Sequence, residues 1–202
     1  MRKICFSEHF GLHNAVLERR KNQTRRLIAK ITNEQIKRFQ AEYYNATFDF
    51  LSGKELLEQY FLIERAGKLP YEIGETVAIA ERYSNIMPDD EQLRKTAGWR
   101  NKMFVKPELM PHHIQMTKIR FEQLQDISDE DCIAEGIYKD DGKTYFNGYA
   151  FQITRDQYGN MLSKQWFPTP REAYAALIDK ISGKGTWESN PYVFAYTFEL
   201  AK

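Results

Sequence analysis

The sequence has few cysteines, no long apolar run and almost no net charge, and each scarcity removes a class of protein. Cys5 and Cys132 are the only cysteines among 202 residues, too few for the disulfide framework of a secreted domain. No apolar run approaches the roughly 20 residues that cross a bilayer. The first ten residues, MRKICFSEHF, lack the apolar region of a signal peptide. We therefore expect a cytoplasmic protein without a membrane partner.

The charges are nearly balanced in number but segregated along the chain. The net charge is only +1, which argues against binding nucleic acid through a positive field over the whole surface. The stretch ERRKNQTRR, residues 18–26, nevertheless carries five cations, whereas DDE at 89–91 and DISDEDCIAE at 126–135 are acidic. This segregation predicts a local positive site.

Strand patterns occur in five short segments, which are residues 3–6, 75–83, 102–106, 113–124 and 192–200. In the fourth of these the apolar side chains change face between Met116 and Ile119. A bulge near Thr117 and Lys118 restores the phase, as happens where a strand bends around a barrel.

Helix patterns with end signals occur at residues 12–20, 128–136 and 169–185. Ser128 and Thr169 are the expected N-caps of the last two, and Gly136 and Gly183 the expected ends. Residues 29–68 are expected to form a helical insertion, and residues 138–167, with the turn signals DDGK and QYGN, a β-hairpin insertion or meander. Together the patterns predict one α+β domain, built as a small β-barrel with surrounding helices.

Four segments resemble, in the same order, those of the ASCH family, a branch of the PUA-like barrels. They are RKNQTRR after the first strand and helix, YEIGETVAIAERY, MPHHIQMTKIRFEQLQDISDEDCIAEGI, and WESNPYVFAYTFEL, which together cover about half of the chain. The most specific feature is a strand that ends in LQDIS and runs into a helix that ends in EG. The larger members in phage and prophage genomes are the most similar.

The resemblance implies a cleft between the barrel and the first helix that accepts a nucleoside, a nucleotide or RNA. Small bacterial members include amidohydrolases that deacetylate acetylcytidine with a Lys, a Thr three residues later, and a Glu from the helix after the long strand. On this chain these positions are Lys21, Thr24 and Glu135. A Gly usually precedes the Arg-Lys pair, and here Arg19 stands in its place, which restricts the backbone there.

The residue types suit amide hydrolysis. A threonine hydroxyl is a nucleophile when a base takes its proton, and a lysine whose pKa is lowered by burial or positive neighbours is such a base. Glu135 would protonate the leaving amine or position water. For Lys21 and Thr24 the alternative is a solvated basic loop, and for Glu135 a surface acid at the end of a helix.

The remaining cations of the basic stretch are candidate binding residues for substrate or nucleic acid. Arg20, Arg25 and Arg26 would supply positive charge, and Arg26 could grip a phosphate or carboxylate with two hydrogen bonds. Glu81 would pair with one of these arginines, and an ordinary structural ion pair is the alternative.

No metal and no cofactor are predicted. Cys5, His9 and His13 have a ligand-like spacing, but Gly11 interrupts the helix that would align them. The three tryptophans, Trp99, Trp166 and Trp187, either stack on bases or belong to the core.

Three functions remain open at this point. The first is an amidohydrolase acting on an acylated nucleobase such as acetylcytidine, and the second is a non-catalytic reader of RNA or of a modified base. The third is a ribonuclease that uses the same cleft. The sequence leaves the oligomeric state open, and a shared fold does not choose among these functions.

Overall fold

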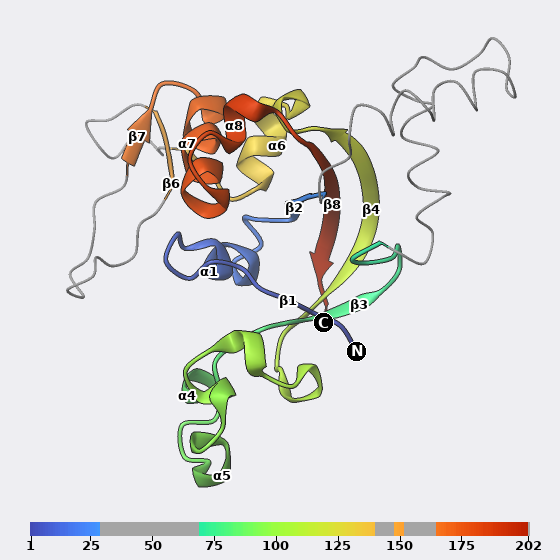
Figure 1. Cartoon of the computed structure of the whole chain (residues 1–202), viewed down its shortest axis with the longest axis vertical. Helices are drawn as coiled ribbons and strands as arrows, with labels where there is room; N and C mark the ends of the chain where they lie inside the picture. The colour runs from blue at the N-terminus through green and yellow to red at the C-terminus, as the bar shows by residue number, and fades with distance from the viewer. Residues whose placement is uncertain (29–68, 140–147, 152–164, 202) are drawn as a thin grey trace, which may run out of the picture.

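The strands of the computed structural model form two separate sheets (Figure 1). The structure describes residues 1–28, 69–139, 148–151 and 165–201. The five-stranded sheet has the order β1-β3-β4-β8-β2, and the three-stranded sheet the order β5-β6-β7. In chain order the strands are β1 (Lys3–Ile4), β2 (Gln23–Leu27), β3 (Thr76–Ile79), β4 (His113–Gln123), β5 (Tyr138–Lys139), β6 (Tyr149–Phe151), β7 (Gln165–Phe167) and β8 (Tyr192–Leu200).

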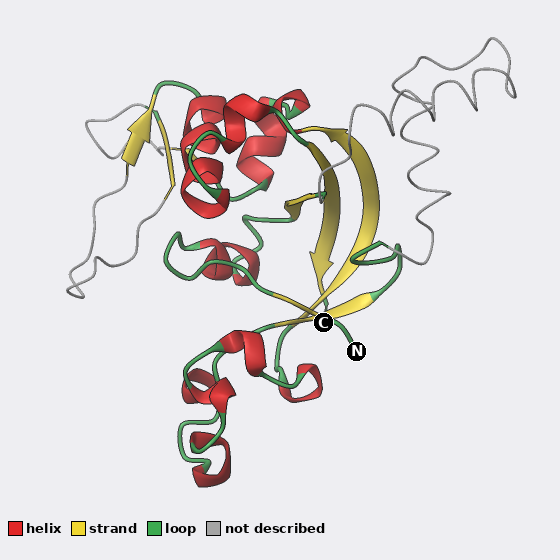
Figure 2. Cartoon of the chain, viewed as in Figure 1, coloured by secondary structure: helices red, strands yellow, loops and turns green. Residues whose placement is uncertain are grey.

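The two long strands β4 and β8 pair with each other inside the larger sheet and curve together (Figure 2). The register between them shifts between Met116 and Lys118, which confirms the predicted bulge. Ile114 and Met116 before the bulge, and Ile119 and Phe121 after it, are all buried. The extra residue thus keeps the apolar side chains of one strand on the core side.

Short helices fill the chain between the strands. They are α1 (Leu12–Leu17), α4 (Tyr83–Ile86), α5 (Glu91–Arg94), α6 (Asp129–Ala134), α7 (Pro170–Ser182) and α8 (Thr186–Ser189), with 3-10 turns η1 (Ala97–Trp99), η2 (Lys102–Phe104), η3 (Pro107–Leu109) and η4 (Leu124–Asp126). None of the described helices has the length and apolarity that crossing a membrane requires.

The predicted caps of α6 and α7 are confirmed. The Ser128 side chain accepts a hydrogen bond from the Asp131 backbone N–H, and Thr169 accepts one from that of Glu172. Helix α7 ends at Gly183, whose φ of 110° lies in the region that favours glycine. Its apolar stripe packs into the main core, which fixes the place of α7 against the larger sheet.

The α+β class is confirmed, and the pairing of the described strands is that of an open sheet with β1 and β2 at its edges. The three short strands β5, β6 and β7 pair antiparallel within the stretch predicted as a hairpin or meander. The predicted helical insertion at 29–68 lies outside the described residues.

Two sequence predictions of local structure are wrong. Residues 102–106 were expected as a strand, but Lys102–Phe104 forms η2, because the Asn101 side chain accepts a hydrogen bond from the Met103 backbone and starts a turn. Residues 21–26 were expected in a loop after a helix over 12–20. The helix ends at Leu17, and Gln23–Leu27 forms the edge strand β2 against β8.

Candidate functional site

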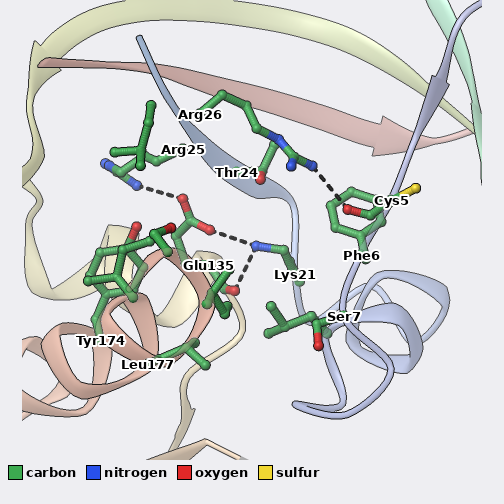
Figure 3. Close-up of a pocket in the computed structure, with 15 residues that line it drawn as sticks. Cys5, Phe6, Ser7, Lys21, Thr24, Arg25, Arg26, Glu135, Tyr174 and Leu177 are labelled. Carbon is green, nitrogen blue, oxygen red and sulfur yellow. Dashed lines mark hydrogen bonds and ion pairs between the residues drawn. The ribbon is translucent and has the colours of Figure 1, made fainter. Parts of the chain in front are cut away.

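A pocket of about 220 Å³ opens where the segment after β1 meets α1, β2, the end of α6 and α7. Figure 3 shows its side chains converging from these elements. The lining residues are Cys5, Phe6, Ser7, Leu12, Lys21, Thr24, Arg25, Arg26, Leu27, Glu135, Tyr174, Leu177, Ile178, Ile181 and Ser182. The polar members come from β2 and its neighbours, whereas α7 contributes an apolar wall.

Lys21 reaches the pocket because the chain turns sharply after α1. Arg19 has a φ of 59°, a left-handed conformation that glycine adopts freely and other residues rarely adopt. The turn directs Lys21 inward, and its side chain is 1% exposed. Gly136 makes room on the other side, because a Cβ there would lie 3.0 Å from Leu12 and 3.5 Å from the Lys21 side chain.

The Lys21 ammonium is held by three oxygen atoms. Its Nζ donates to the Gln23 carbonyl at 2.6 Å, to the Glu135 carbonyl at 2.7 Å and to Glu135 Oε2 at 2.6 Å. The pair joins residues 114 positions apart, and both side chains are buried. Lys21 and Glu135 therefore form one buried ion pair, and none of these hydrogen bonds goes to Thr24.

Burial lowers the pKa of Lys21. The Glu135 carboxylate opposes this shift, whereas the positive charges of Arg26 and Arg25 add to it, and the net direction is downward. A lysine with a lowered pKa has a larger neutral fraction at neutral pH than an exposed one. This is the property that a lysine base requires.

Thr24 and Arg26 contribute further polar groups to the pocket. The Thr24 side chain is buried, and its hydroxyl forms no hydrogen bond within the part of the chain that the structure describes. Arg26 donates from Nη2 to the Cys5 carbonyl at 3.2 Å, but its buried Nε has no partner. Arg26 also has no carboxylate partner among the described residues.

Arg25, predicted as a binding residue, lines the pocket, and its guanidinium pairs with carboxylates of the protein. It contacts Glu122 at 2.6 Å, Asp131 at 2.8 Å and Glu135 at 3.2 Å, and its side chain is 1% exposed. Arg25 therefore positions Glu135 from the side opposite Lys21, as Figure 3 shows.

Arg20 and Glu81 do not belong to the pocket. Arg20 is exposed and pairs with Glu18 at 2.6 Å. Glu81 pairs with His13 at 3.4 Å and with His112 at 2.7 Å rather than with an arginine of the basic stretch. The Glu81 carboxylate is held by His13 of α1 and by His112 before β4, whereas Arg25 and Arg26 of β2 contact other groups.

Sequence reasoning missed the apolar wall of the pocket. Tyr174, Leu177 and Ile178 of α7 form it, and burial raises the pKa of Tyr174 well above its ordinary value. The apolar stripe of α7 was visible in the sequence, but nothing there indicated that one of its ends faces a cavity. No tryptophan of the described residues lines this pocket.

Within the described residues no group of three or more His, Cys, Asp and Glu side chains could hold a metal ion. Comparisons of the chain with family models, with curated proteins and with solved structures find no match. The geometry of the pocket is therefore the basis for assigning a function to this chain.

Proposed function

We propose that this chain is an ASCH-type protein with a PUA-like fold. Three observations support the proposal: the bulge in β4, the helix α6 that follows it, and the turn at Arg19. Arg19 stands where the family has a glycine and keeps a positive φ of 59°. A non-glycine residue in this conformation costs about 1–2 kcal/mol, so the turn is maintained against an energetic penalty.

We infer that the pocket hydrolyses the amide bond of an acylated nucleobase. The observation that carries this inference is the convergence of Lys21, Thr24 and Glu135 in one pocket. A buried lysine of lowered pKa, a buried threonine hydroxyl and a buried carboxylate are together a base, a nucleophile and an acid.

The reaction proceeds in two steps. Neutral Lys21 takes the proton of Thr24 Oγ1 as this oxygen attacks the acyl carbon, and the bond from that carbon to the amino nitrogen of the base breaks. The leaving nitrogen takes a proton from the Lys21–Glu135 pair, and the acyl group remains as an ester on Thr24. Water, deprotonated by the same pair, then attacks the acyl carbon of this ester. The bond from that carbon to Thr24 Oγ1 breaks, the Thr24 oxygen regains its proton from the pair, and the carboxylic acid is released.

The two faces of the pocket favour a planar, polar-edged ligand. Leu177, Ile178 and Phe6 offer an apolar surface to the flat face of a ring, whereas Arg26 and Thr24 offer donors at its edge. The volume of about 220 Å³ lies below the roughly 300–1,000 Å³ of sites for drug-sized molecules. A single nucleobase matches this size and polarity.

The proposed activity is tested by incubating the protein with acetylcytidine and separating the products by chromatography. We expect wild type to release cytidine and Thr24→Ala to lower the rate by about 100-fold or more, because the attacking oxygen is lost. Thr117→Ala removes an exposed hydroxyl elsewhere on the larger sheet and is the matched control, with an unchanged rate. Absence of cytidine at high wild-type concentration would rule out this substrate.

The rate of hydrolysis is expected to rise with pH. The reactive form of Lys21 is the neutral amine, so the midpoint of the rise reports its pKa, which we expect below the ordinary lysine value of 10.5. Arg26→Gln removes a positive charge that lowers this pKa and should move the midpoint to higher pH. A rate that falls as pH increases would exclude Lys21 as the base.

One observation favours a reader of RNA or of a modified base as the second candidate. All three hydrogen bonds of the Lys21 ammonium go to protein oxygens, as in a purely structural ion pair. A protein that reads an RNA backbone loses affinity steeply as salt increases, because counterion release drives binding. A pocket that binds only a nucleoside is far less sensitive to salt.

A further inference from the structure

A second positively charged surface lies outside the pocket, on the segment between β3 and β4. Residues 93–106, LRKTAGWRNKMFVK, contain five cations and no acid. We call residues 93–106 the basic lobe. Figure 1 shows α4, α5 and the turns after them projecting from the end of the larger sheet where β1 and β3 lie.

Most cations of the basic lobe are not neutralised by the protein. Arg94, Lys95, Arg100 and Lys106 are exposed and form no ion pair with the described carboxylates, whereas Lys102 contacts Glu8 at 3.2 Å. Among the nearby acids, Asp90 caps α5 and Glu108 pairs with the amino terminus, whereas Asp89 and Glu91 are exposed just before the lobe. The lobe therefore carries its positive charge next to a short acidic stretch, on a nearly neutral protein.

Aromatic side chains are interleaved with these cations. A cavity of about 380 Å³ is lined by Arg94, Thr96, Ala97, Trp99 and Arg100. The Arg94 guanidinium lies over the Trp99 ring, 5.4 Å from its centroid, and Phe104 is 64% exposed. Unpaired bases stack on aromatic rings and on guanidinium planes, whereas phosphates pair with the cations.

The basic lobe is anchored rather than loose. Gly98 lies against the buried Tyr83 ring so closely that a Cβ there would approach it to 2.4 Å. The Tyr83 hydroxyl accepts a hydrogen bond from the Lys106 backbone at 2.7 Å. Such anchoring holds Trp99 and its flanking arginines in a fixed arrangement, which lowers the entropy that a ligand must remove on binding.

The basic lobe also adjoins the pocket. Lys102 donates to the Phe6 carbonyl, and Cys5 Sγ lies 3.4 Å from Met103 Sδ. Cys5 and Phe6 both line the pocket, and the Cys5 carbonyl is the acceptor for Arg26. The turn η2 of the lobe therefore contacts the backbone segment that forms one wall of the pocket.

From these observations we propose that the basic lobe binds single-stranded nucleic acid, with bases stacked at Trp99 and phosphates on Arg94 and Arg100. This binding does not depend on hydrolysis in the pocket. If the proposed function holds as well, the base that enters the pocket belongs to a strand, and the lobe supplies the affinity for its backbone.

The test is fluorescence anisotropy with a labelled oligouridylate of about 12 nucleotides, within the range of single-strand site sizes. We expect wild type to bind it more tightly than an RNA duplex of the same length. Arg94→Gln/Arg100→Gln should lower the affinity about 10- to 30-fold and reduce the slope of log affinity against log salt by about 1.4. Trp99→Leu should lower the affinity about 5- to 150-fold with the slope unchanged.

The matched control is Lys118→Gln/Lys139→Gln, which removes two exposed cations from other elements. An equal loss of affinity in this control would overturn the proposal, because any surface charge would then serve. Equal loss in Thr24→Ala would place the strand in the pocket and also overturn it. If oligoglutamate of the same charge displaces the labelled oligouridylate as effectively as unlabelled oligouridylate does, then any acidic polymer binds and the proposal is overturned. An oligothymidylate arm distinguishes DNA from RNA as the source of the strand.

Discussion

Replacing Arg25 by methionine is expected to lower the free energy of unfolding by about 3–5 kcal/mol, the cost of breaking a buried ion pair by removing one partner. The guanidinium of Arg25 contacts three carboxylates, those of Glu122, Asp131 and Glu135. Methionine fills a similar volume, so the loss reports charge rather than packing. Urea denaturation of wild type and variant measures it.

The carboxylates keep Arg25 charged in spite of its burial. Burial alone lowers the pKa of a guanidinium, but Glu135 and Glu122 raise it by more, and the net pKa lies above the ordinary arginine value. Without Arg25, the carboxylates of Glu122, Asp131 and Glu135 lose their shared partner. Arg120 is the remaining arginine of the network, and it contacts Asp131 and Glu122. Arg120 can pair with two of the acids but has no contact with Glu135 in this structure.

The matched control for this variant is Arg20→Met. Arg20 pairs with Glu18 at 2.6 Å, but the two side chains are 40% and 57% exposed, and exposed pairs contribute about 0–1 kcal/mol. Arg25→Lys keeps the charge but not the fork that reaches several oxygens, so we expect it to lie between methionine and wild type. A methionine variant as stable as Arg20→Met would show that the network adds nothing to stability.

Lowering the pH should narrow the difference in the free energy of unfolding between wild type and Arg25→Met. Burial raises the pKa of Asp131, but hydrogen bonds from Gln23, Arg120 and Arg25 lower it by more, so it lies below the ordinary value of 3.8 in the folded protein. Its contribution to stability is therefore complete above the unfolded pKa and is lost as pH falls through the folded pKa. The variant has less of this contribution to lose.

The parts of the fold that local signals encode were predictable from the sequence. Ser128 and Thr169 start helices because their side chains accept hydrogen bonds from backbone N–H groups three residues on, a relation visible within four positions. The bulge in β4 was predictable for a similar reason, since a change of face between Met116 and Ile119 can be read along one strand.

Strand β2 was not predictable, because its stabilisation comes from far along the chain. Its sequence, QTRRL, has neither apolar alternation nor β-branched runs. Arg25 is buried there only because acids 97–110 positions away meet it. The same distance explains why the ion pairs of Arg25, predicted as a ligand-binding cation, could not be foreseen from the sequence. The prediction that one site contains Lys21, Thr24 and Glu135 came from the family resemblance, because no spacing pattern in the sequence indicated it.

The second large effect is expected in a double-mutant cycle on Lys21 and Glu135. Lys21→Met and Glu135→Met each remove one partner of a buried pair 2.6 Å apart, and each should lower the free energy of unfolding by about 3–5 kcal/mol. The double variant removes both charges and should be about as stable as either single variant. The coupling energy is then about as large as one single loss, about 3–5 kcal/mol, at or above the upper end of the range for residues in contact. The exposed Arg20–Glu18 pair gives the reference cycle, with a coupling below about 1 kcal/mol.

Activity measured on the same four proteins separates the structural role of the pair from its chemical role. If Lys21 is the base and Glu135 the acid, the double variant recovers stability relative to the sum of the single losses but recovers no hydrolysis. If the pair only holds β2 against the end of α6, hydrolysis or nucleoside affinity follows stability, and the double variant is no worse than either single variant. Retention of a tenth or more of the wild-type rate in folded Lys21→Met would exclude Lys21 as the base. In that case the Thr24 hydroxyl and Arg26 would be donors to a bound base, and the pocket would bind its ligand without changing it.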